Sequence, residues 1–310
     1  MSVLAVGAVA LAFALEAAFA EAPARMHPVA WFGRAVGPFD REWRSPILTG
    51  AAVAVVLPLA AAAVVGGVVS LGGRIHPLAG AALAGLALFA TTSLQMLLGE
   101  ARAVVAATAE NLPGARQRLR SLAGRDASDL SAGEVRSAAV ESAAENLADG
   151  LVAPLLAFAL GAAVSLPVAA AAAAWVKAVN TLDSMLGYRS KRVGTASARL
   201  DDAVMWLPAR LTALLVAGAA LAPGSLNRAS AHASTPPSPN SGWPMATLAA
   251  ALDVRLAKPG AYDLPLGDGF PTVAESQRAV SVVRTAGVLA YALTAAAVSL
   301  GPGTGVVAWP

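Results

Sequence analysis

The sequence predicts an all-α, polytopic integral membrane protein with about five to six membrane segments plus amphipathic helices. Only 13% of the 310 residues are charged, whereas 57% are hydrophobic. The mean hydropathy of +0.63 does not describe a soluble globule. Several stretches also reach the ~20 apolar residues that a helix needs to cross a hydrocarbon core. These stretches are residues 1–20, 47–71, 77–98, 151–176, 204–222 and 285–303.

Charge and composition exclude several kinds of protein. The chain contains no cysteine, so disulfides, thiolate metal sites and a cysteine nucleophile are ruled out. The net charge of +3 comes from Arg-rich loops, and no basic run interleaved with aromatic residues suggests nucleic acid as a partner. We expect the Arg-rich loops 21–46 and 99–149 on the cytoplasmic side and the amino terminus outside. The expected location is the bacterial inner (plasma) membrane, with residues 1–310 as a single multi-pass domain embedded in the lipid bilayer.

The first half of the chain predicts an uncleaved first span followed by a helical hairpin. Residues 47–71 and 77–98 form the hairpin, and the stretch Gly72-Gly-Arg-Ile-His-Pro77 is expected to be the tight turn between them, because glycine and proline break helices. Residues 99–149 are expected to be mostly helical and amphipathic. Asp129 or Ser131 is expected to cap the last of these helices, and Glu134 three residues after Ser131 fits a capping box.

Residues 151–176 allow two interpretations. A straight helix of this length would span the bilayer. Gly161 and Pro167 also allow a re-entrant pair of half-helices. The first interpretation places the polar residues before and after this segment on opposite sides of the membrane, and the second places them on one side. A single active site favours the second, or else a site sunk into the protein at membrane depth. The basic loop at 175–203 again favours the second.

The last third of the chain mixes loops and helices. The Pro/Ser-rich residues 223–242 are expected to form a mobile loop. An amphipathic helix is expected from Gly242 to Leu256, ended by Lys258-Pro-Gly-Ala-Tyr262. A polar helix at 272–284 leads into the last span.

The polar stretch 134–210 stands out in this apolar chain as the candidate catalytic region. Glu141, Glu145 and Asp149 have the i, i+4, i+8 spacing that places them along one helical face, with Asn146 beside them. Like charges in a row destabilise a helix, so the stripe suggests a divalent metal or an ammonium group. An ordinary solvated face is the alternative.

A second polar group follows the apolar segment. Lys177, Asn180 and Ser184 share a helical face, Asp183 is adjacent, and Gly187 is expected to end the helix. Lys177 and Asp183 could instead form a structural ion pair. Arg199, Asp201 and Asp202 come next, and Arg210 opens the following span. The two aspartates could simply cap a helix that begins near Ala203.

Six motifs carry a resemblance to a known family. They are His27-Pro-Val, Glu141-Ser-Ala-Ala-Glu-Asn-Leu-Ala-Asp-Gly, Lys177-Ala-Val-Asn-Thr-Leu-Asp-Ser-Met-Leu-Gly-Tyr, Ser197-Ala-Arg-Leu-Asp-Asp, Leu207-Pro-Ala-Arg-Leu-Thr and Ser238-Pro-Asn-Ser-Gly-Trp-Pro-Met-Ala. In order and spacing the chain resembles the adenosylcobinamide-phosphate synthase family of cobalamin biosynthesis (CobD/CbiB) over nearly its whole length. The resemblance implies an ATP-dependent ligase that joins aminopropanol or its phosphate to a propionate carboxylate of adenosylcobyric acid, with ATP as co-substrate and Mg²⁺ as cofactor.

That chemistry gives the candidate residues their expected roles. Carboxylates hold Mg²⁺, cations bind phosphate or propionate, and a histidine can act as a base toward the amine. The expected catalytic residues are His27, Glu141, Glu145, Lys177 and Asp183. The expected substrate-binding residues are Asn146, Asn180, Tyr188, Arg199, Arg210, Asn240 and Trp243. The expected metal ligands are Glu145, Asp149, Asp201 and Asp202.

Other interpretations remain for some residues and for the whole chain. His76 and His232 are taken as structural, and Trp243 could be an interfacial anchor. No Gly-x4-Gly-Lys-Ser/Thr loop is present, so only the resemblance supplies the nucleotide. A membrane transporter of a polar or corrinoid solute is the main rival, but it predicts repeated halves that the sequence does not show. A CDP-alcohol phosphotransferase would need Ala-Arg after Asp149-Gly150, and a non-catalytic sensor would lack charged motif residues. The need for cobalamin-assembly partner proteins stays open.

Overall fold

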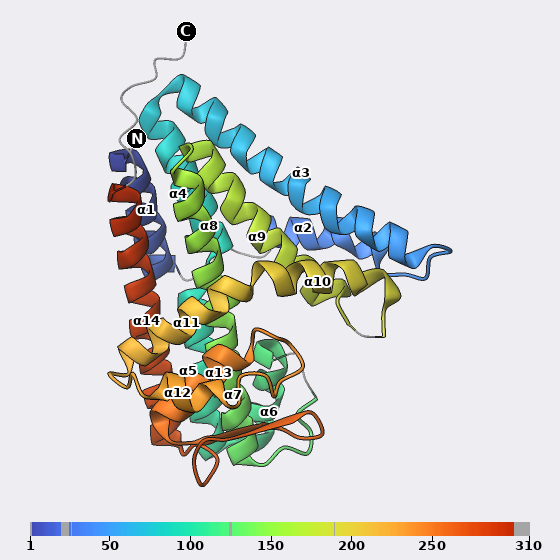
Figure 1. Cartoon of the computed structure of the whole chain (residues 1–310), viewed down its shortest axis with the longest axis vertical. Coiled ribbons are helices and arrows are strands. Elements are labelled where there is room, and N and C mark those ends of the chain that lie inside the picture. The colour runs from blue at the N-terminus through green and yellow to red at the C-terminus, as the bar shows by residue number, and fades with distance from the viewer. Residues whose placement is uncertain (1, 20–24, 26, 124–125, 189, 301–310) are drawn as a thin grey trace. The chain divides into compact units, whose positions relative to one another are not determined.

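The structure is a computed structural model that describes residues 2–19, 25, 27–123, 126–188 and 190–300 (Figure 1). It is mostly helical, as the sequence predicts. Five helices in the described residues are long and apolar enough to cross a membrane, and a bent pair gives a sixth. The five are Ser2–Phe19, Pro46–Ile75, Pro77–Glu110, Ala132–Ala162 and Val273–Leu300, and the bent pair is Arg192–Val204 with Trp206–Ala219. The chain is therefore a multi-pass membrane protein. Residues 301–303 of the expected last span lie outside the described residues.

The chain divides into two compact units. Unit 1 comprises Met1–Ser93, Ala153–Val204 and Tyr291–Pro310, and unit 2 comprises Leu94–Val152 and Met205–Ala290. The helix α14 (Val273–Leu300) contributes its first part to unit 2 and its last part to unit 1.

Unit 1 is a bundle of helices. Its members are α1 (Ser2–Phe19), α2 (Pro28–Val36), α3 (Pro46–Ile75), α4 (Pro77–Thr91), α8 (Ala153–Ala162), α9 (Leu166–Leu186) and α10 (Thr195–Val204), with the short 3₁₀ turns η1 (Gly37–Phe39) and η3 (Arg192–Gly194). The helix α3 packs against α4 and α9, and α1 packs against α4. Large apolar side chains of α3 such as Val56, Leu59 and Leu71 stay exposed, as expected for a face that meets lipid.

The predicted hairpin is present as α3 and α4, but its turn is shorter than expected. The helix α3 continues through Gly72 and Gly73 to Ile75, so the expectation that these glycines break it is wrong. Only His76 leaves the helical conformation, with φ −160° and ψ 136°. Its Nδ1 accepts a hydrogen bond from the Leu78 amide at 3.2 Å and thereby caps α4. Pro77 follows as the first residue of α4, where its missing N–H is not needed.

Residues 151–176 form two helices, so the interpretation as one straight helix is wrong. The helix α8 ends at Ala162, the amides of Val164 and Ser165 both donate to the Gly161 carbonyl, and α9 begins at Leu166. The two helices pack against each other and lie side by side in Figure 1. A Cβ on Gly161 would lie 2.7 Å from the Ala169 Cα, so the contact requires glycine.

A buried polar contact joins three segments of unit 1. Glu16 on α1 is 1% exposed, and its carboxylate accepts a hydrogen bond from the Thr92 hydroxyl at 2.7 Å. The Tyr291 hydroxyl on α14 donates to the Thr92 oxygen at 3.0 Å. Because an unpaired polar group inside an apolar bundle is costly, these contacts stabilise the arrangement of the segments.

Unit 2 contains α5 (Leu94–Glu110), α6 (Leu112–Ala123) and α7 (Ala132–Leu147), which enclose a small core around Val104, Leu119 and Ala138. The capping box at the start of α7 is confirmed: Ser131 Oγ accepts from the Glu134 amide, and the Glu134 carboxylate accepts from the Ser131 amide. A π turn, η2 (Ala148–Val152), follows α7.

The rest of unit 2 differs from the sequence prediction in two segments. After α11 (Trp206–Ala219), the segment expected to be a mobile loop contains α12 (Ser225–Ser230) and turns, with Ala233 and Asn240 buried. The helix α13 (Gly242–Leu252) ends earlier than expected, at Asp253, whose φ of 58° is left-handed. Residues 255–258 form a strand, β1 (Arg255–Lys258), paired antiparallel with β2 (Tyr262–Pro265). The expected helix to Leu256 is therefore wrong, and Lys258-Pro-Gly-Ala-Tyr262 is the turn of a β-hairpin.

The close contact at Gly161 gives a testable prediction. Gly161→Ala should destabilise the detergent-solubilised protein, because overpacking typically costs about 1–3 kcal/mol. The measurement is the thermal unfolding midpoint. Gly67→Ala is the matched control, since a Cβ at Gly67 of α3 meets nothing within 4 Å. Equal midpoints for the two variants would contradict the tight α8–α9 contact.

Candidate functional site

The structure distributes the predicted site residues over both units. Unit 1 holds His27, Lys177, Asn180, Asp183, Tyr188, Arg199, Asp201 and Asp202. Unit 2 holds Glu141, Glu145, Asn146, Asp149, Arg210, Asn240 and Trp243.

Two motifs of unit 1 meet where α10 packs on α9. Asn180 on α9 and Asp201 on α10 approach to 3.5 Å, with the amide nitrogen as donor. The apolar cluster beneath them, which includes Val53, Leu182 and Leu186, fixes the position of both helices. Asp201 and its neighbour Asp202 lie near the end of α10, not before a helix, so the capping interpretation is wrong. Negative charge is unfavourable at a helix C-terminus, so α10 itself gives no reason for these aspartates.

Asp183 is the carboxylate in the most unusual surroundings. It lies in the last turn of α9, beyond the apolar residues expected in the membrane, and its Oδ1 is buried without a hydrogen-bond partner among the described residues. Burial, and secondarily the negative charge of Asp202, raises the pKa of Asp183 to about 6. Gly187 ends α9 as predicted, and a Cβ there would lie 1.8 Å from Oδ1. This glycine therefore leaves room for the carboxylate.

Lys177 lines a cavity of about 90 Å³ inside unit 1. Small side chains of α3, α4 and α9 form most of its wall, and the hydroxyl residues Thr91 and Thr181 also line it. Pro28 and Val29 of the His-Pro-Val motif contribute a further side. The structure thus brings the predicted lysine motif and the predicted histidine motif to one cavity.

His27 itself is a helix cap. It is 7% exposed, and its Nδ1 accepts a hydrogen bond from the Val29 amide at 3.3 Å, at the start of α2. In a neutral imidazole that accepts through Nδ1, the proton is on Nε2, which is then a donor. Acting as a base would therefore require His27 to give up its cap.

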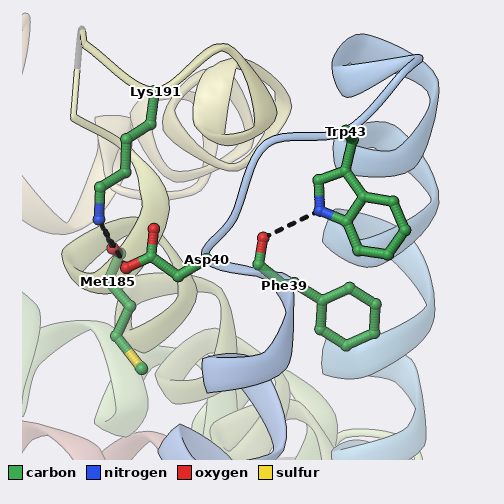
Figure 2. A network of polar contacts seen from close by, with 5 residues as sticks. All are labelled: Phe39, Asp40, Trp43, Met185 and Lys191. Carbon is green, nitrogen blue, oxygen red and sulfur yellow. Dashed lines mark hydrogen bonds and ion pairs between the residues drawn. The ribbon is translucent and has the colours of Figure 1, made fainter.

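A polar network holds the end of α9 to the segment after α2 (Figure 2). Lys191 Nζ lies 2.8 Å from the Asp40 carboxylate and donates to the Met185 carbonyl at 3.2 Å. Its charge also lies 5.0 Å from the centre of the Tyr188 ring. Trp43 donates to the Phe39 carbonyl in the same segment. Tyr188 is 58% exposed next to this network, and Arg199 is exposed on α10.

In unit 2, Glu141 is fully buried. Its carboxylate accepts hydrogen bonds from the Ser137 and Tyr262 hydroxyls, both at 2.7 Å. The Ser137 oxygen also accepts from the Ala257 amide at 2.9 Å, so the carboxylate joins α7 to the β-hairpin. A solvated face is therefore the wrong interpretation of the acidic stripe, and this arrangement favours a structural role for Glu141 over contact with substrate.

The remaining residues of the stripe are more accessible. Glu145, Asn146 and Asp149 are half-buried, and Asn146 donates to the Ser142 carbonyl. Asp149 lies in the π turn η2, a kind of irregularity that is frequent at functional sites. Among the residues that the structure describes, no three His, Cys, Asp or Glu side chains form a cluster suited to a metal ion.

Arg210, Asn240 and Trp243 lie close together in unit 2. Arg210 donates to the Asn240 side-chain oxygen at 2.6 Å and to the Pro239 carbonyl at 3.1 Å. Its guanidinium carbon lies 4.7 Å from the Trp206 ring centre and 5.5 Å from that of Trp243. The guanidinium is thereby held in one orientation.

Sequence reasoning missed several partners of these residues. Trp206 precedes Arg210 by four residues, a helical spacing that could have identified the pair. Tyr262 is far from Glu141 in sequence, and no local pattern indicates their contact.

The raised pKa of Asp183 predicts a pH-dependent stability. An ordinary aspartate titrates near 3.8, so between about pH 4 and pH 6 the folded state binds more protons than the unfolded state. Stability contributed by this group should therefore fall as the pH rises through that window. The measurement is the unfolding midpoint against pH: Asp183→Asn should remove the fall, and Asp202→Asn should shift it to lower pH. An unchanged profile in Asp183→Asn would contradict the assignment.

Comparison with known proteins supports the resemblance seen in the motifs. Residues 9–293 match the family model described as CobD/Cbib protein. A probable cobalamin biosynthesis protein CobD of Methanothrix thermoacetophila is 34% identical over 299 residues, which cover 92% of this chain and 94% of the relative. The cobalamin biosynthesis protein CobD of Geobacter metallireducens is 38% identical, with 83% of each chain covered. That of Mycobacterium tuberculosis is 39% identical over 84% of this chain and 86% of the relative. No solved structure matches. The chain therefore belongs to the CobD/CbiB family of cobalamin biosynthesis proteins.

Proposed function

We propose that the protein is an adenosylcobinamide(-phosphate) synthase, an ATP-dependent ligase that joins the amine of aminopropanol or its phosphate to a propionate carboxylate of adenosylcobyric acid. The observation that supports this most is the family match over residues 9–293. That range includes all six motifs, and with them the predicted site residues. The expected location is the bacterial plasma membrane.

The reaction requires activation of the acid. A carboxylate oxygen is a poor leaving group, so it attacks the γ-phosphate of ATP, forming an acyl phosphate and releasing ADP. The amine nitrogen then attacks the acyl carbon, the C–N bond forms, and the C–O bond to phosphate breaks. Overall, a carboxylate, an ammonium and ATP give an amide, ADP, inorganic phosphate and one proton.

The carboxylates of this chain fit Mg²⁺, which supplies charge neutralisation on the transferred phosphate when bound. Mg²⁺ usually takes one or two protein carboxylates and completes its octahedron with waters and phosphate oxygens. The residues proposed to hold Mg²⁺ are Asp201 and Asp202 in unit 1 and Glu145 and Asp149 in unit 2. Asp183 Oδ1 is buried without a hydrogen-bond donor among the described residues. This oxygen supports a metal site at Asp201 and Asp202 in the same unit, because a cation there would compensate the unpaired charge.

The remaining residues have binding and proton-transfer roles in this proposal. Lys177 on the wall of the small cavity provides a cation for a phosphate group. The Thr181 hydroxyl beside it donates to the Lys177 carbonyl at 2.7 Å and so supports the helix at this point. Asn146, Asn180, Tyr188 and Arg199 supply further contacts with the substrates. Glu141 lies on the same helix as Glu145 and has a structural role, because its hydrogen bonds hold that helix to the β-hairpin. Glu145 and Asp183 are the carboxylates proposed for proton transfer.

Product formation tests the function. Purified full-length protein in detergent, given adenosylcobyric acid, ATP, Mg²⁺ and either amine, should form the amide. Glu145→Gln and Lys177→Ala should each lower kcat by about tenfold or more, since charge-assisted contacts are among the stronger ones. Failure of folded wild-type protein with both amines would overturn the ligase and favour a transporter, which flux of labelled corrinoid into proteoliposomes would then reveal.

The variant His27→Asn distinguishes the two roles of His27, the helix cap and the predicted base. Asparagine is a good N-cap, so the variant should keep its unfolding midpoint. If His27 also transfers a proton, kcat should fall about 10²-fold or more. His76→Asn is the matched control, because His76 caps α4 in the same way but is exposed. Full activity in both variants would leave His27 with the cap alone.

A further inference from the structure

Unit 2 contains a cavity of about 410 Å³ that differs from the small cavity at Lys177. It lies among α11, α12, the turns after α12 and the start of α13. Its lining residues are Arg210, Ser230, Ala233, Ser234, Pro236, Pro237, Pro239 and Trp243. No family motif or predicted role includes the serines and prolines at 230–237.

Arg210 has donors to spare after its internal contacts. A guanidinium carries five N–H groups. Nη1 donates to the Trp206 carbonyl at 3.0 Å and to the Asn240 side chain at 2.6 Å, and Nη2 donates once, to Pro239. One N–H on Nε and one on Nη2 remain for a ligand. Two donors on a planar fork suit an oxyanion with two oxygens.

The cavity has a single positive charge, so it suits an oxyanion with a single negative charge. Arg210 is the one cation among the described lining residues, and none of them is acidic. A nucleotide triphosphate would bring several negative charges and a metal ion, for which this wall has no matching groups. An ammonium would be repelled by Arg210. A single carboxylate matches both the charge and the donors.

The walls indicate what the carboxylate is attached to. Trp243 presents an indole, and Pro236, Pro237 and Pro239 present rigid apolar rings, while Ser234 offers an exposed hydroxyl. Such walls suit an apolar edge next to the carboxylate, and the volume of about 410 Å³ holds that edge of a large ligand while the rest of the ligand lies outside the cavity. Rigid walls also lower the entropic penalty of binding, since few side-chain rotamers are lost.

We propose that this cavity binds the monocarboxylate substrate, the corrinoid acid, with Arg210 gripping the carboxylate that is to be activated. This inference rests on the proposed function and assigns the acid, rather than the amine or the nucleotide, to this cavity. Arg210 is then a substrate-binding residue that orients the reacting carboxylate. Ser234 and the three prolines form the wall against the body of the ligand.

Equilibrium dialysis of the full-length protein in detergent, without ATP or amine, tests the assignment. The probes are adenosylcobyric acid and the same corrinoid with that carboxylate converted to a primary amide. Wild type should bind the acid about tenfold or more tightly than the amide. Arg210→Gln should remove this preference, and Ser234→Trp, at an exposed position, should weaken binding of both corrinoids by filling the cavity. Arg255→Gln is the control, because Arg255 pairs with Asp263 and does not line the cavity.

Three outcomes would overturn the assignment. The acid and the amide could bind wild type equally, Ser234→Trp could leave both affinities unchanged, or ATP or inorganic phosphate could displace the acid in an Arg210-dependent way. Product formation separates this failure from failure of the function. Amide synthesis with an unchanged KM for the acid in Arg210→Gln would overturn the cavity assignment and leave the ligase in place. Arg210-dependent binding without synthesis by wild type would instead overturn the ligase.

Discussion

A buried charge in an apolar helical protein must find hydrogen-bond partners, and the packing within each unit depends on this constraint. An unpaired carboxylate away from water is costly enough to change the fold or its own protonation. Glu16 meets Thr92 in unit 1, and Glu141 meets Ser137 and Tyr262 in unit 2. Both contacts join segments far apart in sequence. They therefore select among packings that apolar contacts alone would leave similar in energy.

Asp183 departs from this rule and is for that reason the strongest functional indicator in unit 1. Its Oδ1 is buried without a donor, and the nearby charge of Asp202 has the same sign. A buried carboxylate with a purely structural role normally accepts hydrogen bonds, as Glu141 does from Ser137 and Tyr262. Groups whose pKa is raised by burial and by a like charge concentrate at functional sites. A cation or a proton donor from a substrate would satisfy the Asp183 carboxylate.

Most of the helical architecture could be predicted from local sequence, whereas the contacts that build the site could not. Hydropathy predicts the candidate spans Pro46–Ile75, Pro77–Glu110 and Val273–Leu300, but it does not predict Ala132–Ala162, whose first half is polar. Ser131 with Glu134 predicts the start of α7 because a capping box is a local interaction. The choice between one helix and two at 151–176 depends on the contact of Gly161 with Ala169, which no average over residues registers. The β-hairpin was missed because each of its strands has only 4 residues, which is too short for an alternating pattern to stand out. The pairing of Arg210 with Asn240 spans 30 residues and reflects tertiary packing.

The two His-Pro sequences show why a motif alone does not assign chemistry. His27 and His76 both precede proline, both start a helix, and both accept an amide hydrogen bond through Nδ1 at nearly the same distance. The local sequence therefore explains the cap in each case and explains nothing more. What differs is the surroundings: His76 is exposed, whereas His27 is buried and is followed by Pro28 and Val29, which line the cavity of Lys177. The side chain of His27 is not itself part of the cavity wall. Because the cap is common to both histidines, it gives no evidence of catalysis, and what distinguishes His27 is its burial and the two residues that follow it.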